Sequence, residues 1–383
     1  MNALILSTHT GGGHDAAAYA IEEALTERGV TCRVMDCVAF GGAWLSRCVC
    51  GTYVKWVQVA PRTFGTLYGG CKHVSTSRVK SPVYLFNAAY AHRMQKILEE
   101  FHPDMIICTH VFAGQSVTSL RRRGMYNGLL ATVMTDYTIH PFVEDVESDL
   151  LFIHETAKAE SEKLKTLAPD AIHCTGIPVS LKCTPCHDKR AAKQAVGLDP
   201  DRKEVLLVGG SMGSGNLPGM IGRILPALGK EGHLTVVCGS NVRAKEKAEE
   251  RYGNDSRVTI CGRIAPLTPR IAAADVLVSK SGGLTSTEAM TIGTPMVVSR
   301  PIAGCETENI RFMESKGMAA WARSDDELTD KVAELLQSET ACRQMIAAQR
   351  RNIDPDAARR MAEILIERTA ARGRKEPPDA REA

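Results

Sequence analysis

Short apolar runs alternate with segments of helical periodicity along most of the chain. The runs that predict buried strands lie at residues 3–7, 31–35, 104–109, 129–135, 150–153 and 171–174, and then at 204–209, 234–238, 258–260, 276–279 and 296–299. Helices are expected at residues 14–28, 115–123, 157–167, 217–228, 243–251, 285–291, 309–315, 325–336 and 355–368. Strands that alternate with helices form parallel sheets with helices on both faces.

The alternation breaks between residues 176 and 189, where two prolines and little periodicity indicate a linker. The expected fold class is therefore α/β, with two Rossmann-like, doubly wound domains that face each other across a cleft, at residues 1–180 and 190–350. A chain of 383 residues suits two domains. Residues 351–370 are expected to form a helix that packs back toward the first domain, and residues 371–383 a disordered tail.

The first predicted strand leads into an unbroken glycine turn at residues 11–13, followed by His14. The spacing also fits a dinucleotide-binding fingerprint with Asp36 as the ribose acid, so an NAD dehydrogenase remains a possible interpretation. Asp15 argues against it, because a carboxylate in the first helical turn would repel a pyrophosphate. His14 projects from the carboxyl end of a strand, where an imidazole of near-neutral pKa can accept a proton from an alcohol.

Two further glycine-rich turns, at residues 208–215 and 279–288, each join a strand to a helix. Free backbone N–H groups at the second turn suit a diphosphate, and Glu288 lies one helical turn further on, where it could accept two ribose hydroxyls. Downstream, Glu306 and Asn309 stand three residues apart at the start of a helix, so both can face one sugar. A P-loop sequence is absent, which excludes a P-loop NTPase.

The overall composition is that of a globular protein, with 44% hydrophobic and 24% charged residues and a formal net charge of +3. Such a small charge argues against a general nucleic-acid binder. No uninterrupted apolar run reaches the length of a membrane span, and the first residues lack the basic region of a signal peptide. The 13 cysteines suit a reducing cytoplasm, and the motif at residues 183–187 supplies too few ligands for a predicted metal site.

The near-neutral total conceals one unusual stretch. Residues 37–98 contain no Asp or Glu, eight Lys or Arg, and nine of the 19 aromatic residues of the chain. Basic residues interleaved with aromatics are typical of a surface that binds an anionic membrane. Single-stranded nucleic acid binds similar surfaces, and a pair of ordinary core helices is the plain alternative. The candidate membrane residues in this stretch are Trp44, Lys55, Trp56, Arg62, Arg78 and Lys80.

Several segments, taken in order, resemble the monogalactosyldiacylglycerol synthase and processive diacylglycerol glucosyltransferase family. The resemblance runs from about residue 1 to residue 321, and its markers include residues 11–14, 109–110, 135–136, 209–213 and 280–288. It implies a GT-B glycosyltransferase, with a UDP-sugar held mainly by the second domain and an acceptor lipid held mainly by the first. It also implies inversion at the anomeric carbon, no cofactor and no obligatory metal.

The resemblance also assigns roles to particular residues. His14 is the expected base or an acceptor-site residue, Asp136 is a second candidate for the base, and Gly12 and Gly13 lie on the acceptor side. The donor-binding residues that it implies are Gly209, Ser211, Gly213, Asn241, Arg263, Ile264, Ser281, Gly282, Gly283, Leu284, Thr285, Glu288, Cys305, Glu306 and Asn309. Cys305 stands where the family usually has glutamine, so the identity of the donor sugar is left open. Asp15 is expected to hydrogen-bond His14 and raise its basicity.

The implied function is transfer of a hexose from UDP-glucose or UDP-galactose to diacylglycerol, by a cytoplasmic protein bound peripherally to the inner face of the cell membrane. One alternative is a transferase that adds GlcNAc to an undecaprenyl-linked cell-wall precursor, although the unbroken glycines at residues 11–13 favour the diacylglycerol group. An alternative of another class is a non-catalytic, membrane-bound UDP-sugar sensor.

Overall fold

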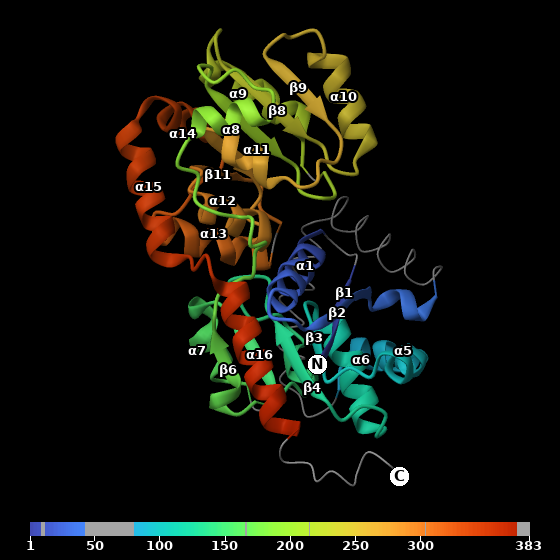
Figure 1. Ribbon diagram of the computed structural model, residues 1–383. Coiled ribbons are helices and arrows are strands. Elements are labelled where there is room, and N and C mark those ends of the chain that lie inside the picture. Colours follow the sequence, from blue (N-terminus) through green and yellow to red (C-terminus); the bar gives the residue numbers. More distant parts are fainter. Residues whose placement is uncertain (9–11, 43–79, 165–166, 214, 303, 374–383) are drawn as a thin grey trace.

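The computed structural model describes residues 1–8, 12–42, 80–164, 167–213, 215–302 and 304–373 (Figure 1). The first half of the chain forms a six-stranded sheet in the order β2-β1-β3-β4-β5-β6, and all of its strand pairs are parallel. Its strands are β1 (Asn2–Ser7), β2 (Thr31–Asp36), β3 (Met105–Cys108), β4 (Leu129–Val133), β5 (Leu150–Ile153) and β6 (Ile172–Cys174).

The second half forms another six-stranded parallel sheet, in the order β12-β11-β10-β7-β8-β9. Its strands are β7 (Glu204–Val208), β8 (His233–Val237), β9 (Val258–Cys261), β10 (Val276–Ser279), β11 (Met296–Ser299) and β12 (Ala320–Ala322). The prediction of two doubly wound α/β units is confirmed. The short edge strand β12 was not predicted.

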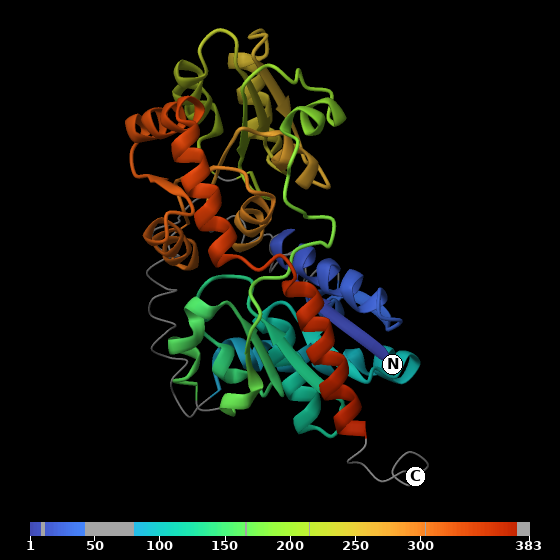
Figure 2. The ribbon, with the colours of Figure 1, turned by 60° about the vertical axis from the view of Figure 1, so that its left-hand side comes forward.

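Helices cover the faces of both sheets (Figures 1 and 2). In the first half they are α1 (Gly12–Thr26), α4 (Pro82–Ala91), α5 (Gln95–Phe101), α6 (Val111–Arg122) and α7 (Lys158–Ser161). In the second half they are α8 (Lys189–Ala195), α9 (Leu217–Leu228), α10 (Val242–Tyr252), α11 (Thr268–Ala273), α12 (Gly283–Ile292), α13 (Cys305–Ser315), α14 (Asp325–Gln337) and α15 (Glu339–Asn352). Short 3₁₀ helices lie at Val38–Gly41, His92–Met94, Val143–Asp145, Glu155–Ala157 and Pro169–Ala171.

The helix α6 begins four residues earlier than its hydrophobic periodicity predicts. The reason is its N-cap, since the Nδ1 atom of His110 accepts a hydrogen bond from the backbone N–H of Phe112 at 3.1 Å. A helix end needs such an acceptor for its unpaired N–H groups, and histidine is not among the usual capping residues. The cap places His110 directly beyond the carboxyl end of β3.

The last helix, α16 (Ala357–Gly373), returns from the second half to the first (Figure 2). Its residues Met361 and Leu365 are fully buried in the same apolar cluster as Ile5 and Ile107 of the first sheet. Arg28 of the first half also pairs with Glu363 at 2.6 Å. Residues 374–383 of the expected tail lie outside the described part of the chain.

The two halves of the molecule share one buried apolar cluster, in which Ala17 and Tyr137 of the first half pack with Leu277 and Ile310 of the second. The strand order reverses between β1 and β3 in the first sheet and between β7 and β10 in the second. Ligands of doubly wound sheets bind beyond the carboxyl ends of the strands at such switch points.

Among the described residues, no helix has the length and apolar character needed to span a bilayer.

Candidate functional site

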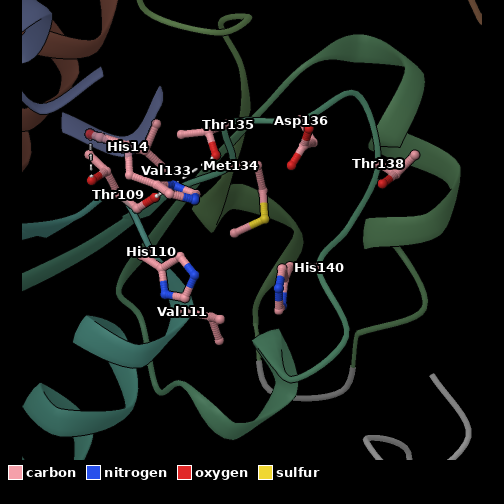
Figure 3. Close-up of a pocket in the computed structure, with 10 residues that line it drawn as sticks. All are labelled: His14, Thr109, His110, Val111, Val133, Met134, Thr135, Asp136, Thr138 and His140. Carbon is pink, nitrogen blue, oxygen red and sulfur yellow. Dashed lines mark hydrogen bonds between the residues drawn. The ribbon is translucent and has the colours of Figure 1, made fainter. Parts of the chain in front are cut away.

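A pocket lies at the carboxyl ends of β3 and β4, beside the start of α1 (Figure 3). Its free volume is about 20 Å³, which is room for about one water molecule. Its lining residues are His14, Thr109, His110, Val111, Val133, Met134, Thr135, Asp136, Thr138 and His140. The predicted catalytic residues His14 and Asp136 are therefore brought to one pocket.

The hydrogen bonds of His14 fix its tautomer. Its Nδ1 atom lies 2.9 Å from the carbonyl oxygen of Thr109 and 3.2 Å from the hydroxyl of Thr135 (Figure 3). A carbonyl only accepts hydrogen bonds, so the proton sits on Nδ1 and the lone pair on Nε2. Burial lowers the pKa of His14, although the carboxylates of Asp136 and Asp15 act in the opposite direction. His14 is therefore neutral near pH 7 and presents a basic Nε2 atom.

The expectation that Asp15 hydrogen-bonds His14 is wrong. The carboxylate of Asp15 accepts a hydrogen bond from the hydroxyl of Ser7 at 2.5 Å, while Thr109 and Thr135 hold Nδ1 of His14. Asp15 still raises the pKa of His14 through its negative charge. This effect is smaller than that of burial, so Asp15 moderates the loss of basicity without reversing it.

Two further histidines line the pocket and were assigned no role from the sequence. The ring of His110 meets that of His14 edge-on, with centroids 4.6 Å apart, and lies 5.8 Å from that of His140. Burial lowers the pKa of His110 well below its usual range and that of His140 to about 3. The pocket is thus lined by three neutral imidazoles. The signal for His110 was its position directly after a predicted strand, and no comparable signal marked His140.

The side chain of Asn309 joins the pocket to the second half of the molecule. Its amide nitrogen donates to Asp136 at 2.7 Å and to the carbonyl of Ser281 at 2.9 Å, and its oxygen accepts from the N–H of Tyr137 at 3.0 Å. The residue is fully buried. Asn309 and Asp136, predicted for sugar binding and for catalysis, therefore meet directly at the boundary between the two halves.

The glycine turns of the two halves touch each other at this boundary. A Cβ atom on Gly283 would lie 1.9 Å from the carbonyl oxygen of Thr135, so the close approach requires glycine. The N–H of Gly12 donates to the hydroxyl of Ser211 at 3.0 Å. The side chain of Leu284 lies next to Gly13. Residues predicted for the acceptor and the donor thus form one continuous surface.

Lys280 is a largely buried cation that was left out of the predicted donor-binding residues. Its ammonium group pairs with the carboxylate of Glu306, and its side chain runs alongside Gly210. Burial acts against its charge, but Glu306 raises the pKa of Lys280 above its usual value. Glu306 also accepts from the N–H of Ile302 at 2.8 Å. Glu306 and Asn309 therefore bind different partners, although their spacing predicted that both would face one ligand.

The other predicted donor residues lie in the loops that leave the second sheet and in the helices that follow them. Glu288 is in α12, where burial raises its pKa to about 7. Ser281 donates to the carbonyl of Glu306 at 2.5 Å, and Asn241 caps α10 and donates to the carbonyl of Gly213 at 2.9 Å. The positions of the remaining ones are as follows: Gly209 after β7, Arg263 and Ile264 after β9, Gly282 as the N-cap of α12, Thr285 in its first turn, and Cys305 at the start of α13.

Most of the candidate membrane residues, namely Trp44, Lys55, Trp56, Arg62 and Arg78, lie outside the described part of the chain. Lys80 is described, and it donates to the carbonyl of Asp145 at 2.9 Å and lies 3.7 Å from Glu147. Its charge is therefore compensated within the protein. On α4, Leu85 and Phe86 are exposed by 62% and 42%, respectively.

Across the described ranges, no group of three or more His, Cys, Asp or Glu residues could hold a metal ion.

Comparison with known protein families matches both halves of the chain. Residues 14–179 match the model for monogalactosyldiacylglycerol (MGDG) synthase, and residues 204–361 match the glycosyltransferase family 28 C-terminal domain. A processive diacylglycerol beta-glucosyltransferase of Bacillus licheniformis is 28% identical over 90% of this chain and 89% of its own length. The protein of the same name in Bacillus cytotoxicus is 25% identical over 96% of this chain and 94% of its own.

Solved structures share the fold. MurG of Acinetobacter baumannii aligns with a TM-score of 0.59 and 17% identity, covering 96% of this chain and 99% of MurG. A UDP-GlcNAc 2-epimerase of Neisseria meningitidis aligns with a TM-score of 0.62 and 14% identity, covering 96% of this chain and 100% of the epimerase. A protein named as a glycosyltransferase of Rickettsia africae aligns as well, with a TM-score of 0.57 and 12% identity over 96% of this chain and 98% of its own. The fold by itself therefore does not distinguish a glycosyltransferase from an epimerase.

The contact between Gly283 and Thr135 generates a prediction about closure of the two halves. We expect Gly283→Ala to force them apart, because the new methyl group would overlap the carbonyl oxygen of Thr135. The free energy of unfolding, measured by urea denaturation, should fall by about 1–3 kcal/mol. The radius of gyration, measured by small-angle scattering, should increase. Gly373→Ala is the matched control, because its methyl group meets no atom within 4 Å. Identical stability and scattering for both variants would contradict the assignment.

Proposed function

We propose that the protein transfers a hexose from a UDP-sugar to diacylglycerol. The chain belongs to the glycosyltransferases in which a monogalactosyldiacylglycerol synthase domain is followed by a family 28 C-terminal domain. The observation that carries the proposal is the meeting of two unlike half-sites. The neutral, basic Nε2 atom of His14 lines a pocket in the first half. Across the boundary lie the first turn of α12 and the cation of Lys280.

On the acceptor side, Nε2 of His14 accepts the proton of the lipid hydroxyl. The hydroxyl oxygen then attacks the anomeric carbon of the sugar as the bond from that carbon to the diphosphate breaks, which inverts the configuration. The carbonyl of Thr109 holds His14 in the tautomer that this step needs. The carboxylate of Asp136, which raises the pKa of His14, stabilises the imidazolium that forms.

On the donor side, the departing diphosphate carries the developing negative charge. The backbone N–H groups of Gly282 and Gly283 at the start of α12 and the ammonium group of Lys280 stabilise that charge without a metal ion. Glu306 balances Lys280 while no diphosphate is bound. Glu288 accepts hydrogen bonds from the ribose hydroxyls, and the backbone of residues 262–264 holds the uracil.

The sugar is glucose or galactose, and the names of the curated relatives favour UDP-glucose. The acceptor reaches the pocket from an anionic membrane surface, on the inner face of the cell membrane, to which the protein binds peripherally. Support for this comes from the exposed apolar side chains of Leu85 and Phe86 on α4. This helix lies in the acid-free stretch of residues 37–98.

The reaction itself is tested with purified protein, a panel of UDP-sugars and vesicles that contain diacylglycerol. We expect a hexosyl-diacylglycerol product, identified by mass, with UDP-glucose or UDP-galactose and none with UDP-GlcNAc. His14→Ala should lower kcat by about 10²–10⁴-fold, because a general base contributes this much, and leave UDP affinity within about twofold, a difference of about 0.4 kcal/mol. Binding of UDP without transfer to any lipid would instead support a UDP-sugar sensor.

The pKa of His14 predicts the pH dependence. Because burial lowers this pKa, kcat/KM should fall in acidic solution as Nε2 becomes protonated, and the fall should begin at a lower pH than for an ordinary histidine. Asp136→Asn removes a carboxylate that raises the pKa, so the acidic limb should move to lower pH. Asp326→Asn, an exposed carboxylate on α14, is the control and should leave the limb in place. A limb that moves to higher pH in Asp136→Asn would count against His14 as the base.

Glu288 predicts that binding of UDP releases protons. Its pKa is about 7 without ligand, and ribose hydroxyls that donate to the carboxylate would lower that pKa. The affinity for UDP should therefore increase as the pH rises toward 7 and level off above it. Calorimetry in buffers of different ionisation enthalpy measures the released protons, and Glu288→Gln should reduce the number while retaining the titration of UDP itself. Equal proton release by both proteins would exclude Glu288 from the ribose site.

The membrane contact is tested by vesicle co-sedimentation. Leu85→Asp combined with Phe86→Asp should weaken binding at least tenfold, because burial of one such side chain in lipid contributes about 1.5–3 kcal/mol. Val242→Asp, which replaces an apolar residue of the second half that is 65% exposed, should bind like the unaltered protein. If the double variant Leu85→Asp/Phe86→Asp binds vesicles as well as the unaltered protein, or if binding does not depend on anionic lipid, the proposed membrane-binding role of α4 is refuted.

A further inference from the structure

We infer that His110 is a specificity-determining residue that donates a hydrogen bond from Nε2 to an ester carbonyl of the lipid acceptor. The inference rests on the proposed function, because it takes diacylglycerol as the acceptor. It adds a contact that neither the matched families nor the names of the relatives describe. Four observations carry it: the tautomer of His110, its neutrality, its place beside His14, and the hydrogen bonds of its neighbours.

The tautomer of His110 follows from the cap of α6. The backbone N–H of Phe112 can only donate, and it points at Nδ1 of His110 at 3.1 Å. Nδ1 must therefore carry the lone pair, which leaves the hydrogen of a neutral imidazole on Nε2. Within the described part of the chain, no group accepts a hydrogen bond from this Nε2. Figure 3 shows one ring nitrogen of His110 facing the interior of the pocket, toward His140.

The environment keeps His110 in this neutral form. Burial lowers its pKa well below the usual range, and the neighbouring His14 and His140 lower it further. A neutral imidazole with its hydrogen on Nε2 is a donor at that atom and cannot act there as a base. His14 has the opposite tautomer, with its hydrogen on Nδ1 and its lone pair on Nε2. The two rings therefore present a matched acceptor and donor.

This pairing fits the polar groups of diacylglycerol. Its hydroxyl group must give up a proton, which suits Nε2 of His14, and its other polar atoms are ester oxygens that can only accept. The ester nearest to the hydroxyl is a few covalent bonds away, and the rings of His14 and His110 are 4.6 Å apart between centroids. A lipid whose hydroxyl lies at His14 thus brings an ester carbonyl within reach of His110.

The hydroxyl of Thr109 donates to the backbone carbonyl of His14 at 3.0 Å. The hydroxyl of Thr135 accepts from Nδ1 of His14 at 3.2 Å, on the side of the ring that faces away from Nε2. Val111, Val133 and Met134 contribute apolar surface. His110 therefore provides a donor of fixed direction in a largely apolar wall, the arrangement that allows one hydrogen bond to discriminate between lipids.

The decisive comparison uses ester and ether lipids. A dialkylglycerol with the same chain lengths keeps the hydroxyl and the apolar chains but lacks the carbonyl oxygens. We expect the unaltered protein to show a kcat/KM for diacylglycerol about three- to tenfold above that for the ether lipid, the contribution of one neutral hydrogen bond. Both lipids are presented in the same mixed micelles with saturating UDP-sugar.

Two substitutions separate the cap from the donor. In His110→Asn the side-chain oxygen can replace Nδ1 as the cap of α6, but no donor reaches the position of Nε2, so the ester preference should disappear. In His110→Gln the longer amide can place an N–H near the position of Nε2, so part of the preference should return. Thermal unfolding of both variants checks that α6 stays folded.

Each outcome has a defined meaning. No transfer to either lipid by the unaltered protein would refute the proposed function itself. Transfer at equal rates to both lipids would overturn only the role of His110, and this result needs no variant. A His110→Asn protein that keeps the ester preference would place the donor elsewhere. If it instead loses activity equally on both lipids and its acidic pH limb moves, His110 positions His14 and does not contact the lipid.

Discussion

The side-chain amide of Asn309 holds together polar groups from two segments that are distant in the chain. It binds the carboxylate of Asp136, the backbone of Tyr137 and the carbonyl of Ser281, all in a place without access to solvent. A buried amide that lost these partners would leave unpaired polar groups on both halves of the molecule. The orientation of the two sheets, the position of Asp136 and the start of α12 are therefore coupled through one residue.

The same boundary holds a buried charge pair that binding of the donor must disturb. Lys280 and Glu306 compensate each other between the two glycine turns of the second half. A diphosphate that arrives at the start of α12 brings negative charge to a cation that already has a partner. In the proposed reaction the hydroxyls of the sugar are further donors to Glu306 once the diphosphate binds Lys280. This arrangement would explain how a residue that faces Lys280 in the free protein could still contact the sugar.

The sequence was sufficient to predict the two parallel sheets, because buried strands and amphipathic helices leave clear periodic patterns. The family resemblance named His14 and Asp136 as candidates for the base, and the structure brings both to one pocket. The sequence did not predict the helices α4, α5, α8, α11 and α15. In α4, apolar residues occupy nearly every position, so no polar face marks the helical period. The partners of Glu306 and Asn309 were beyond reach as well, because spacing along a helix defines a shared face but not which groups of the other half meet it.

The two sides of the site make opposite electrostatic demands, and the fold meets them with different means. A neutral lipid needs a pocket without cationic side chains, and burial keeps His14, His110 and His140 uncharged. A leaving diphosphate needs positive potential, which Lys280 and the first turn of α12 provide. If the histidines were charged, His14 could not accept a proton, and if the second half lacked a cation, the leaving group would have no counter-charge. Segregation of these functions onto two sheets allows each environment to be optimised, and Asn309 brings them together at the point of reaction.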